Sequence, residues 1–312
     1  MRYIEFVNEL IKKKVLESSE RNNLVLFGQN ITTGSSLSGL TRDLQVNEGS
    51  LIINTPNSEN TLTGIGFGLM LNKTDAIFFI KQQDFLLLGI DHLVNTYNFI
   101  RRKNPLASFT IVFLTVDNGY QGLQSSLNNL GDFCSIARIP GFAITNKVDA
   151  EEIINKHLIS PGFRIISVSQ RLVGQELINL EKVYSNSESN LFQYSEGNDA
   201  TIVCFNFSLP YGLELSNKLK ETNLSSSLFS VNNFTPINWN KIIDDVKKTR
   251  KLVIIDDSKS ENLSYCNLLM NILEECKLDK KIIIKRDFSK DWLSPCLDNL
   301  EINYNKIIGD LK

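Results

Sequence analysis

Residues 51–95 constrain the fold more than any other stretch, because short apolar runs alternate there with helix-forming segments. Residues 51–53 and 76–80 are apolar runs next to polar, turn-forming residues, as expected of strands. Between them, residues 61–71 are small, apolar and rich in glycine, which predicts a buried helix packed closely against its neighbours. A further helix is predicted over residues 85–102. Strand, helix, strand and helix in this order indicate an α/β fold with a parallel sheet covered on both faces.

A single carboxylate, Glu59, stands just before the apolar helix, and no further charged residue follows until Lys73. Glu59 could be a simple helix cap, because a carboxylate accepts hydrogen bonds from free N–H groups and interacts favourably with the helix dipole. It could equally be a functional group, because apolar surroundings raise the pKa of a carboxylate and favour proton sharing. These residues alone leave both explanations open.

The remaining sequence indicates two domains, and 312 residues are enough for two apolar cores. Further buried strands are predicted at residues 23–27, 109–116 and 164–168. Between residues 185 and 198 the composition becomes polar, and we place the domain boundary there. The predicted domains are residues 1–190 and residues 197–312, and the second repeats the alternation of strands and helices.

Composition excludes several classes of protein. The net charge of −2 and the absence of a dominant basic patch argue against nucleic-acid binding. No uninterrupted apolar segment reaches the roughly 18 residues of a membrane span, so a cytoplasmic protein is expected. The five cysteines lack metal-type spacing. With only His92 and His157 present, we expect neither a metal site nor histidine catalysis within this chain.

Several motifs occur in the order found in one family: Thr55-Pro56-Asn57-Ser58-Glu59, the glycine-rich helix, the strand at 76–80, Phe85, and Asp91 to Asn95. Together they resemble the pyrimidine-binding domain of thiamine diphosphate enzymes, in particular the β subunit of the decarboxylating component of 2-oxo acid dehydrogenases. The second half resembles the carboxyl-terminal domain of the transketolase family. This resemblance implies two three-layer αβα domains.

The resemblance also implies roles for individual residues. Glu59 would bond to the pyrimidine ring and activate the cofactor, and Phe85 would stack on that ring. Asn57 and Lys81 stand at positions that are apolar cofactor contacts in the family. Gln29, like Asn30 after it, is an amide where the family commonly has an acid. Residues 32–39 are either a surface loop or a cover over the cofactor site.

One expected catalytic residue is missing. The family places a histidine in the loop after the strand at 109–116, whereas no histidine lies between His92 and His157 here. Alignment without gaps puts Asn128 at that position, and a gapped alignment puts Ser125 there. Either side chain can hydrogen-bond a substrate oxygen, but neither exchanges protons near neutral pH.

The family holds the cofactor's diphosphate through Mg²⁺ with a Gly-Asp-Gly motif, of which Gly131-Asp132-Phe133 is only a fragment. The resemblance therefore implies an α-type partner chain that carries the diphosphate-binding domain and Mg²⁺. Thiamine diphosphate would then be shared at the interface of an α2β2 assembly.

The implied activity is decarboxylation and dehydrogenation of a 2-oxo acid through an enamine intermediate, in a complex with the partner. One alternative is a subunit of a split transketolase-like ketol transferase or carboligase. Another is a non-catalytic scaffold or regulatory subunit, which the amides at 29, 30 and 128 favour and the retained Glu59 disfavours.

Overall fold

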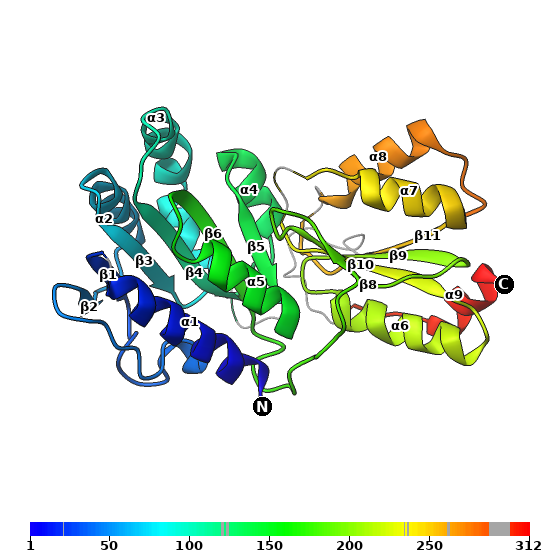
Figure 1. Cartoon of the computed structure of the whole chain (residues 1–312), viewed down its shortest axis with the longest axis horizontal. Helices are drawn as coiled ribbons and strands as arrows, with labels where there is room; N and C mark the ends of the chain where they lie inside the picture. Colours follow the sequence, from blue (N-terminus) through cyan, green and yellow to red (C-terminus); the bar gives the residue numbers. More distant parts are fainter. Residues whose placement is uncertain are drawn as a thin grey trace.

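The computed structural model describes residues 1–20, 22–119, 122, 125–233, 235, 237–260, 263–286 and 300–312. Within these ranges the strands form two six-stranded sheets that lie side by side, each between two layers of helices (Figure 1). This arrangement confirms the predicted fold class of two three-layer αβα domains. The four described cysteines are free thiols, and Cys296 lies outside the described residues.

The first sheet has the strand order β2-β1-β3-β4-β6-β5, and every described neighbouring pair is parallel. Its strands are β1 (Leu24–Gly28), β2 (Leu51–Asn54), β3 (Asp75–Ile80), β4 (Ser108–Thr115), β5 (Gly141–Ile144) and β6 (Gly162–Ser169). Every residue of β3 and β4 is buried, because helices cover these central strands on both faces. Their apolar runs predicted this burial.

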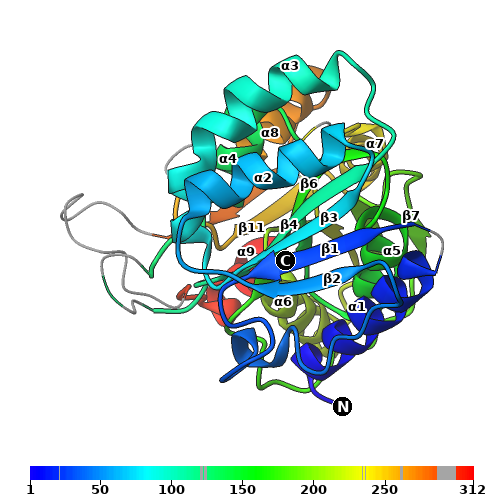
Figure 2. The same cartoon turned by 90° about the vertical axis from the view of Figure 1, so that its left-hand side faces the viewer.

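Helices cover both faces of the first sheet (Figure 2). One face carries α1 (Tyr3–Ser19) and α5 (Lys147–His157). The other carries α2 (Glu59–Leu71), α3 (Tyr97–Arg101) and α4 (Leu130–Ala137). Each face has its own apolar cluster, so α2 and the residue that starts it, Glu59, are fixed by packing against the sheet.

The segment after β3 differs from the single helix predicted over residues 85–102. It consists of a 3-10 helix, η2 (Gln83–Gly89), a π-helix, η3 (His92–Thr96), and α3. Gly89 lies so close to α2 that a Cβ atom there would be 2.5 Å from Thr63 Oγ1. Tertiary packing of this kind outweighs the local preference for a regular helix.

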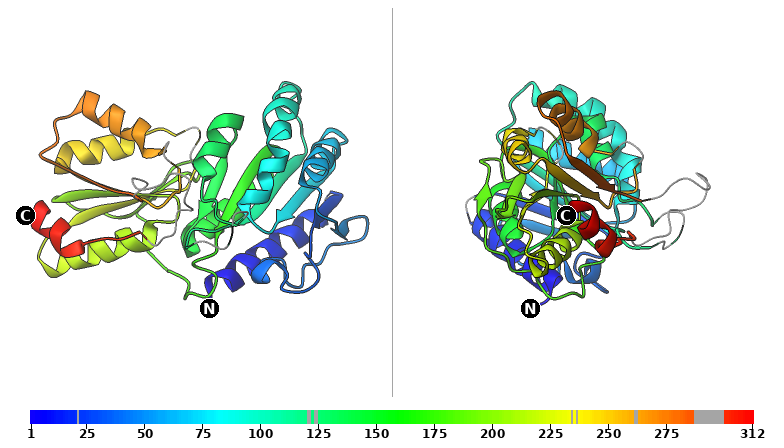
Figure 3. Two further views of the ribbon diagram at one scale, coloured as in Figure 1. Left: turned by 180° about the vertical axis from the view of Figure 1, so that it is seen from behind. Right: turned by 90° about the vertical axis from the view of Figure 1, so that its right-hand side faces the viewer.

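The second sheet has the strand order β12-β11-β9-β10-β8-β7. Its strands are β7 (Tyr184–Ser185), β8 (Leu191–Ser195), β9 (Ala200–Phe205), β10 (Ser226–Val231), β11 (Lys251–Asp256) and β12 (Lys280–Ile284). β8 is antiparallel to both β7 and β10, whereas the other described pairs are parallel. The helices α6 (Leu209–Glu221) and α9 (Tyr304–Leu311) cover one face, and α7 (Asn240–Thr249) and α8 (Tyr265–Glu275) cover the other (Figure 3).

The polar stretch 185–198 is not the linker that we expected, since β8 lies inside it and pairs with the second sheet. Residues 191–194 are all buried, although polar residues surround them in the sequence. The change from the first sheet to the second falls between β6 and β7, earlier than the predicted limits of 190 and 197. Composition did not reveal this strand, because a strand can be short and have polar neighbours in the sequence.

Candidate functional site

A small pocket lies where β1 and β3 end and α2 begins. Because β1 and β3 are parallel neighbours, with Gly28 opposite Phe79, their carboxyl ends open at the same edge of the sheet. The pocket is lined by Gln29, Pro56, Asn57, Glu59, Leu62, Phe78, Phe79, Ile80, Lys81 and Phe85. The structure therefore brings together all five residues that were predicted to contact a cofactor.

Glu59 is the first residue of α2 and is only 8% exposed. Its backbone carbonyl accepts a bond of 2.7 Å from Thr63 Oγ1, but its carboxylate receives no hydrogen bond or ion pair from any described residue. The carboxylate thus does not cap the helix by binding its free N–H groups. A nearly buried carboxylate without a donor is costly, and it remains available to a ligand.

The walls around Glu59 are apolar and closely packed. Phe27 and Phe78 stack with their ring centroids 5.0 Å apart. Gly28 has a φ of +152°, and a Cβ atom there would lie 2.2 Å from Phe79 O, so only glycine fits at the end of β1. The interior measures about 10 Å³, room for about one water molecule. On this chain alone, the pocket is therefore too small to enclose a whole ring.

The rim of the pocket is polar. Asn57 and Lys81 are exposed, whereas Gln29 and Phe85 are half-buried. Lys81 is the only cation among the residues that line the pocket. The loop 32–39, for which a cover over the site was one alternative, contributes no lining residue, and its Leu37 packs into the cluster around α1.

The two loop residues proposed to replace the missing histidine lie in different places, and neither lines the pocket. Ser125 Oγ donates a bond of 2.6 Å to Gln82 Oε1, beside Lys81. Asn128 is fully buried between the domains, where its Nδ2 donates to Asp257 O at 2.8 Å and its Oδ1 accepts from Asn206 Nδ2 at 2.6 Å. The amide of Asn128 is thus occupied by structural contacts.

Charged groups join the two domains next to this loop. Arg171 Nε lies 3.3 Å from Asp117 Oδ2, and Arg171 Nη2 lies 3.2 Å from Asp257 Oδ2. Burial acts to lower the pKa of Arg171, but the two carboxylates together have a larger effect, so the pKa of Arg171 is raised overall. Burial raises the pKa of Asp257 to about 6, against the opposing effect of Arg171. These ion pairs between the domains could not be predicted from the sequence, because the three residues are far apart in the chain.

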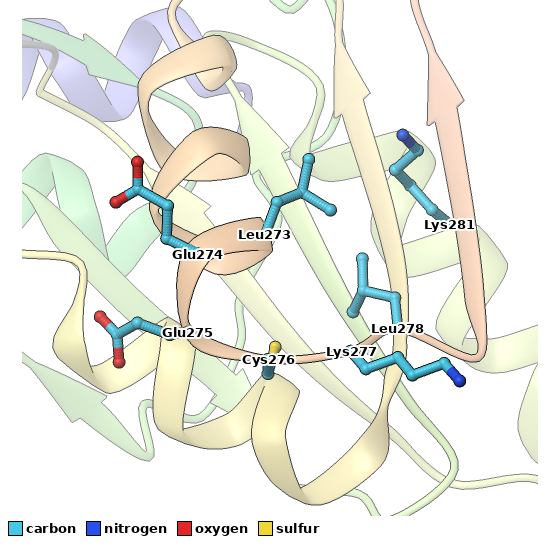
Figure 4. A pocket seen from close by; sticks show the side chains of 7 residues that line it. All are labelled: Leu273, Glu274, Glu275, Cys276, Lys277, Leu278 and Lys281. Atoms are coloured by element: carbon cyan, nitrogen blue, oxygen red, sulfur yellow. The ribbon is translucent and has the colours of Figure 1, made fainter.

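A larger hollow lies at the far end of the second domain, between α8 and β12, and measures about 660 Å³ (Figure 4). Its charged side chains do not converge: Glu274 and Glu275 extend away from Lys281. Glu275 is paired with Lys247 at 2.6 Å. We therefore regard the Glu59 pocket as the candidate site.

Known proteins with similar sequences and similar structures exist, although no protein-family model matches the chain. The chain is 21% identical over 262 residues to pyruvate dehydrogenase E1 component subunit beta-1 of rice, covering 80% of this chain and 69% of that protein. It is 22% identical over 296 residues to the 2-oxoisovalerate dehydrogenase subunit beta of Bacillus subtilis, covering 92% and 88%.

Solved structures show the same fold. A split gene transketolase, described as an inactive beta4 tetramer, matches with a TM-score of 0.67 and 12% identity over 98% of this chain and 96% of that one. The transketolase of Campylobacter jejuni matches with a TM-score of 0.64 and 13% identity, covering 89% of this chain and 40% of that chain. The chain is thus similar in sequence to 2-oxo acid dehydrogenase β subunits and in fold to transketolases, which confirms the resemblance that its motifs indicated.

The described residues include neither a membrane-spanning helix nor a cluster of metal ligands. No described helix is long and apolar enough to span a membrane. No group of three or more His, Cys, Asp or Glu side chains in the described ranges is arranged to hold a metal ion. Asp132 of the incomplete Gly-Asp-Gly motif is bonded to Asn129 Nδ2 at 2.7 Å and to Ser260 Oγ at 2.9 Å.

Proposed function

We propose that this chain is the β-type subunit of a two-chain, cytoplasmic thiamine diphosphate enzyme that acts on a 2-oxo acid. The observation that carries the proposal is the Glu59 carboxylate, which is nearly buried, faces an apolar pocket and has no donor among the described residues. Such a group fits the polar edge of a pyrimidine ring, because a ring N–H or a shared proton would supply the missing hydrogen bond.

The other residues of the pocket would each have a role in binding. Phe85 would lie against the ring face, and the apolar walls would exclude water and strengthen the bond to Glu59. Gln29 and Asn57 at the rim offer amides to polar groups of the cofactor or substrate. Thiamine diphosphate, when bound, supplies the carbanion chemistry, while this chain orients it and holds the proton at the Glu59 carboxylate.

A partner chain would complete the site, since the pocket on this chain is too small to enclose a ring. Surface residues support this part of the proposal. The side of α2, η2 and α3 that faces away from the first sheet carries five large apolar side chains, each 48% to 64% exposed: Ile65, Leu71, Leu87, Leu88 and Phe99. Large apolar side chains exposed on neighbouring elements are typical of protein interfaces. We infer that an α-type chain docks there, brings Mg²⁺ and the diphosphate-binding domain, and forms an α2β2 assembly.

A split transketolase-like ketol transferase or carboligase is the second candidate. The absence of histidine between His92 and His157 favours it, because transfer to a lipoyl group would lack the family's usual proton-handling residue. The non-catalytic alternative loses part of its support, since Asn128 has a structural use in the domain joint.

The first test is titration calorimetry of thiamine diphosphate with Mg²⁺ into this chain, into a candidate α chain and into their complex. Binding to the complex alone is the expected result, and no binding to any of the three would contradict the proposal. Glu59→Gln should abolish 2-oxo acid-dependent reduction of ferricyanide by the complex without lowering the urea midpoint of the chain. The exposed Glu196→Gln is the matched control, and full activity of Glu59→Gln would exclude the assigned role.

A further inference from the structure

Residues 125–129 of the loop before α4 are held by side chains that lie between two pocket residues. Gln82, Gln83 and Asp84, all at least nine-tenths buried, separate Lys81 from Phe85. The bonds to this segment are Ser125 Oγ to Gln82 Oε1 (2.6 Å), Ser126 N to Asp84 Oδ1 (2.9 Å), Leu127 N to both Asp84 oxygens (3.2 Å each) and Asn129 N to Gln83 Oε1 (3.1 Å). The loop thus directs its N–H groups at the pocket segment.

The second domain holds the carbonyl side of the same loop. Lys259, in the segment after β11, donates its backbone N–H to Asn128 O at 2.8 Å. Its ammonium donates to Ser126 O at 3.0 Å and to Gly119 O at 2.7 Å. The peptide groups around Ser126 therefore lie between a carboxylate of the first domain and an ammonium of the second. Bonds to charged groups of this kind are stronger than neutral ones, and they fix the loop on both sides.

We propose that Asp84 and Lys259 are positioning residues, which hold residues 125–129 beside the Glu59 pocket so that Ser125 reaches the substrate. The second domain thereby supports the site of the first. The inference rests on the proposed function in one respect: Ser125 takes the place of the missing loop histidine as a hydrogen-bond donor to a substrate oxygen. The holding of the loop itself is a property of this chain alone.

Hydrogen exchange of the isolated chain tests the holding of the loop without any activity measurement. We expect Asp84→Asn and Lys259→Met to speed exchange at Ser126 and Leu127 at least tenfold while β4 stays protected. Lys259→Arg, which keeps the charge and donors, should retain protection. The exposed Asp244→Asn and Lys277→Met are the matched controls. Unchanged exchange in both test variants would overturn the inference.

Kinetics of the complex with its partner test the positioning. For Asp84→Asn and Lys259→Met we expect kcat to fall at least tenfold while the Kd for thiamine diphosphate stays within twofold, because Glu59 and Phe85 are untouched. A general folding defect would instead weaken cofactor binding and lower the urea midpoint together. Wild-type kcat in both variants would overturn the positioning role. A wild-type complex that binds no cofactor would overturn the proposed function and the role of Ser125. Faster exchange in Asp84→Asn and Lys259→Met would still support the holding of the loop by these two residues.

Discussion

Two glycines of α2 allow a sharp test of how the pocket helix is packed. A Cβ atom at Gly66 would lie 2.1 to 2.6 Å from three ring carbons of Phe109 in β4, whereas nothing lies within 4 Å of a Cβ atom at Gly68. Both residues are helical, so replacement by alanine gains about 1 kcal/mol of helix propensity at either position. Gly66→Ala and Gly68→Ala should therefore differ in stability only through the packing of the new methyl group.

Phe109 cannot easily make room for the new methyl group. It is fully buried, and its ring centroid lies 5.0 Å from that of Phe67 and 5.1 Å from that of Phe163. Ordinary carbon contacts are about 3.5 to 4.0 Å, so the ring or α2 must move by more than about 1 Å. Overpacking of this severity costs about 3 kcal/mol. We therefore expect Gly66→Ala to lower the unfolding free energy by about 2 kcal/mol and Gly68→Ala to raise it by about 1 kcal/mol.

Urea unfolding of the isolated chain measures the difference. With a slope of about 3 kcal/mol per molar, the midpoints of the two variants should differ by roughly 1 M. Unchanged slopes would show that neither variant alters the surface exposed on unfolding. If Gly66→Ala proved as stable as Gly68→Ala, α2 would not be packed on β4 as the structure has it. The position of Glu59 at the start of α2 would then also be wrong.

Two further variants probe other parts of the chain. Burial lowers the pKa of His157 from 6.5 to about 4, so its contribution to stability is complete above pH 6.5 and is lost as the pH falls towards 4, because the unfolded chain takes up the proton first. Between pH 7.5 and pH 5, wild type should lose about 1 to 2 kcal/mol more than His157→Gln in urea unfolding; equal losses would contradict the burial of this imidazole. Arg171→Met leaves the buried carboxylates of Asp117 and Asp257 without their cation, and should lower the unfolding free energy by about 3 kcal/mol. A urea midpoint equal to that of wild type would show that the two ion pairs of Arg171 do not stabilise the contact between the domains.

Much of the first domain could be predicted from the sequence, because its central strands are buried on both faces and appear as unbroken apolar runs. The fully buried β3 and β4 are examples. The helix predicted over residues 85–102 was less regular than expected, since its winding depends on Gly89 against α2 and on bonds from residues 82–84 to a distant loop. Local periodicity contains no information about such contacts.

The candidate site, too, could be predicted from the sequence only in part. Gln29, Asn57, Glu59, Lys81 and Phe85 meet because parallel neighbouring strands end at one edge, which the order of motifs along the chain determines. The position of Asn128 could not be predicted, because its partners Asn206 and Asp257 belong to the other domain. Counting residues along a loop cannot decide which of them faces the pocket when the other domain holds that loop in place.

A comparison among buried carboxylates separates structural roles from functional ones. The described residues include seven: Glu59, Asp75, Asp84, Asp117, Asp149, Asp256 and Asp257. Each of the six aspartates accepts at least one hydrogen bond from a described residue, as expected of groups that stabilise the fold. The Glu59 carboxylate alone among the seven accepts none from a described residue. Folding gains nothing from an unpartnered carboxylate in an apolar pocket and is opposed by its desolvation, which supports our proposal that a ligand supplies the missing donor.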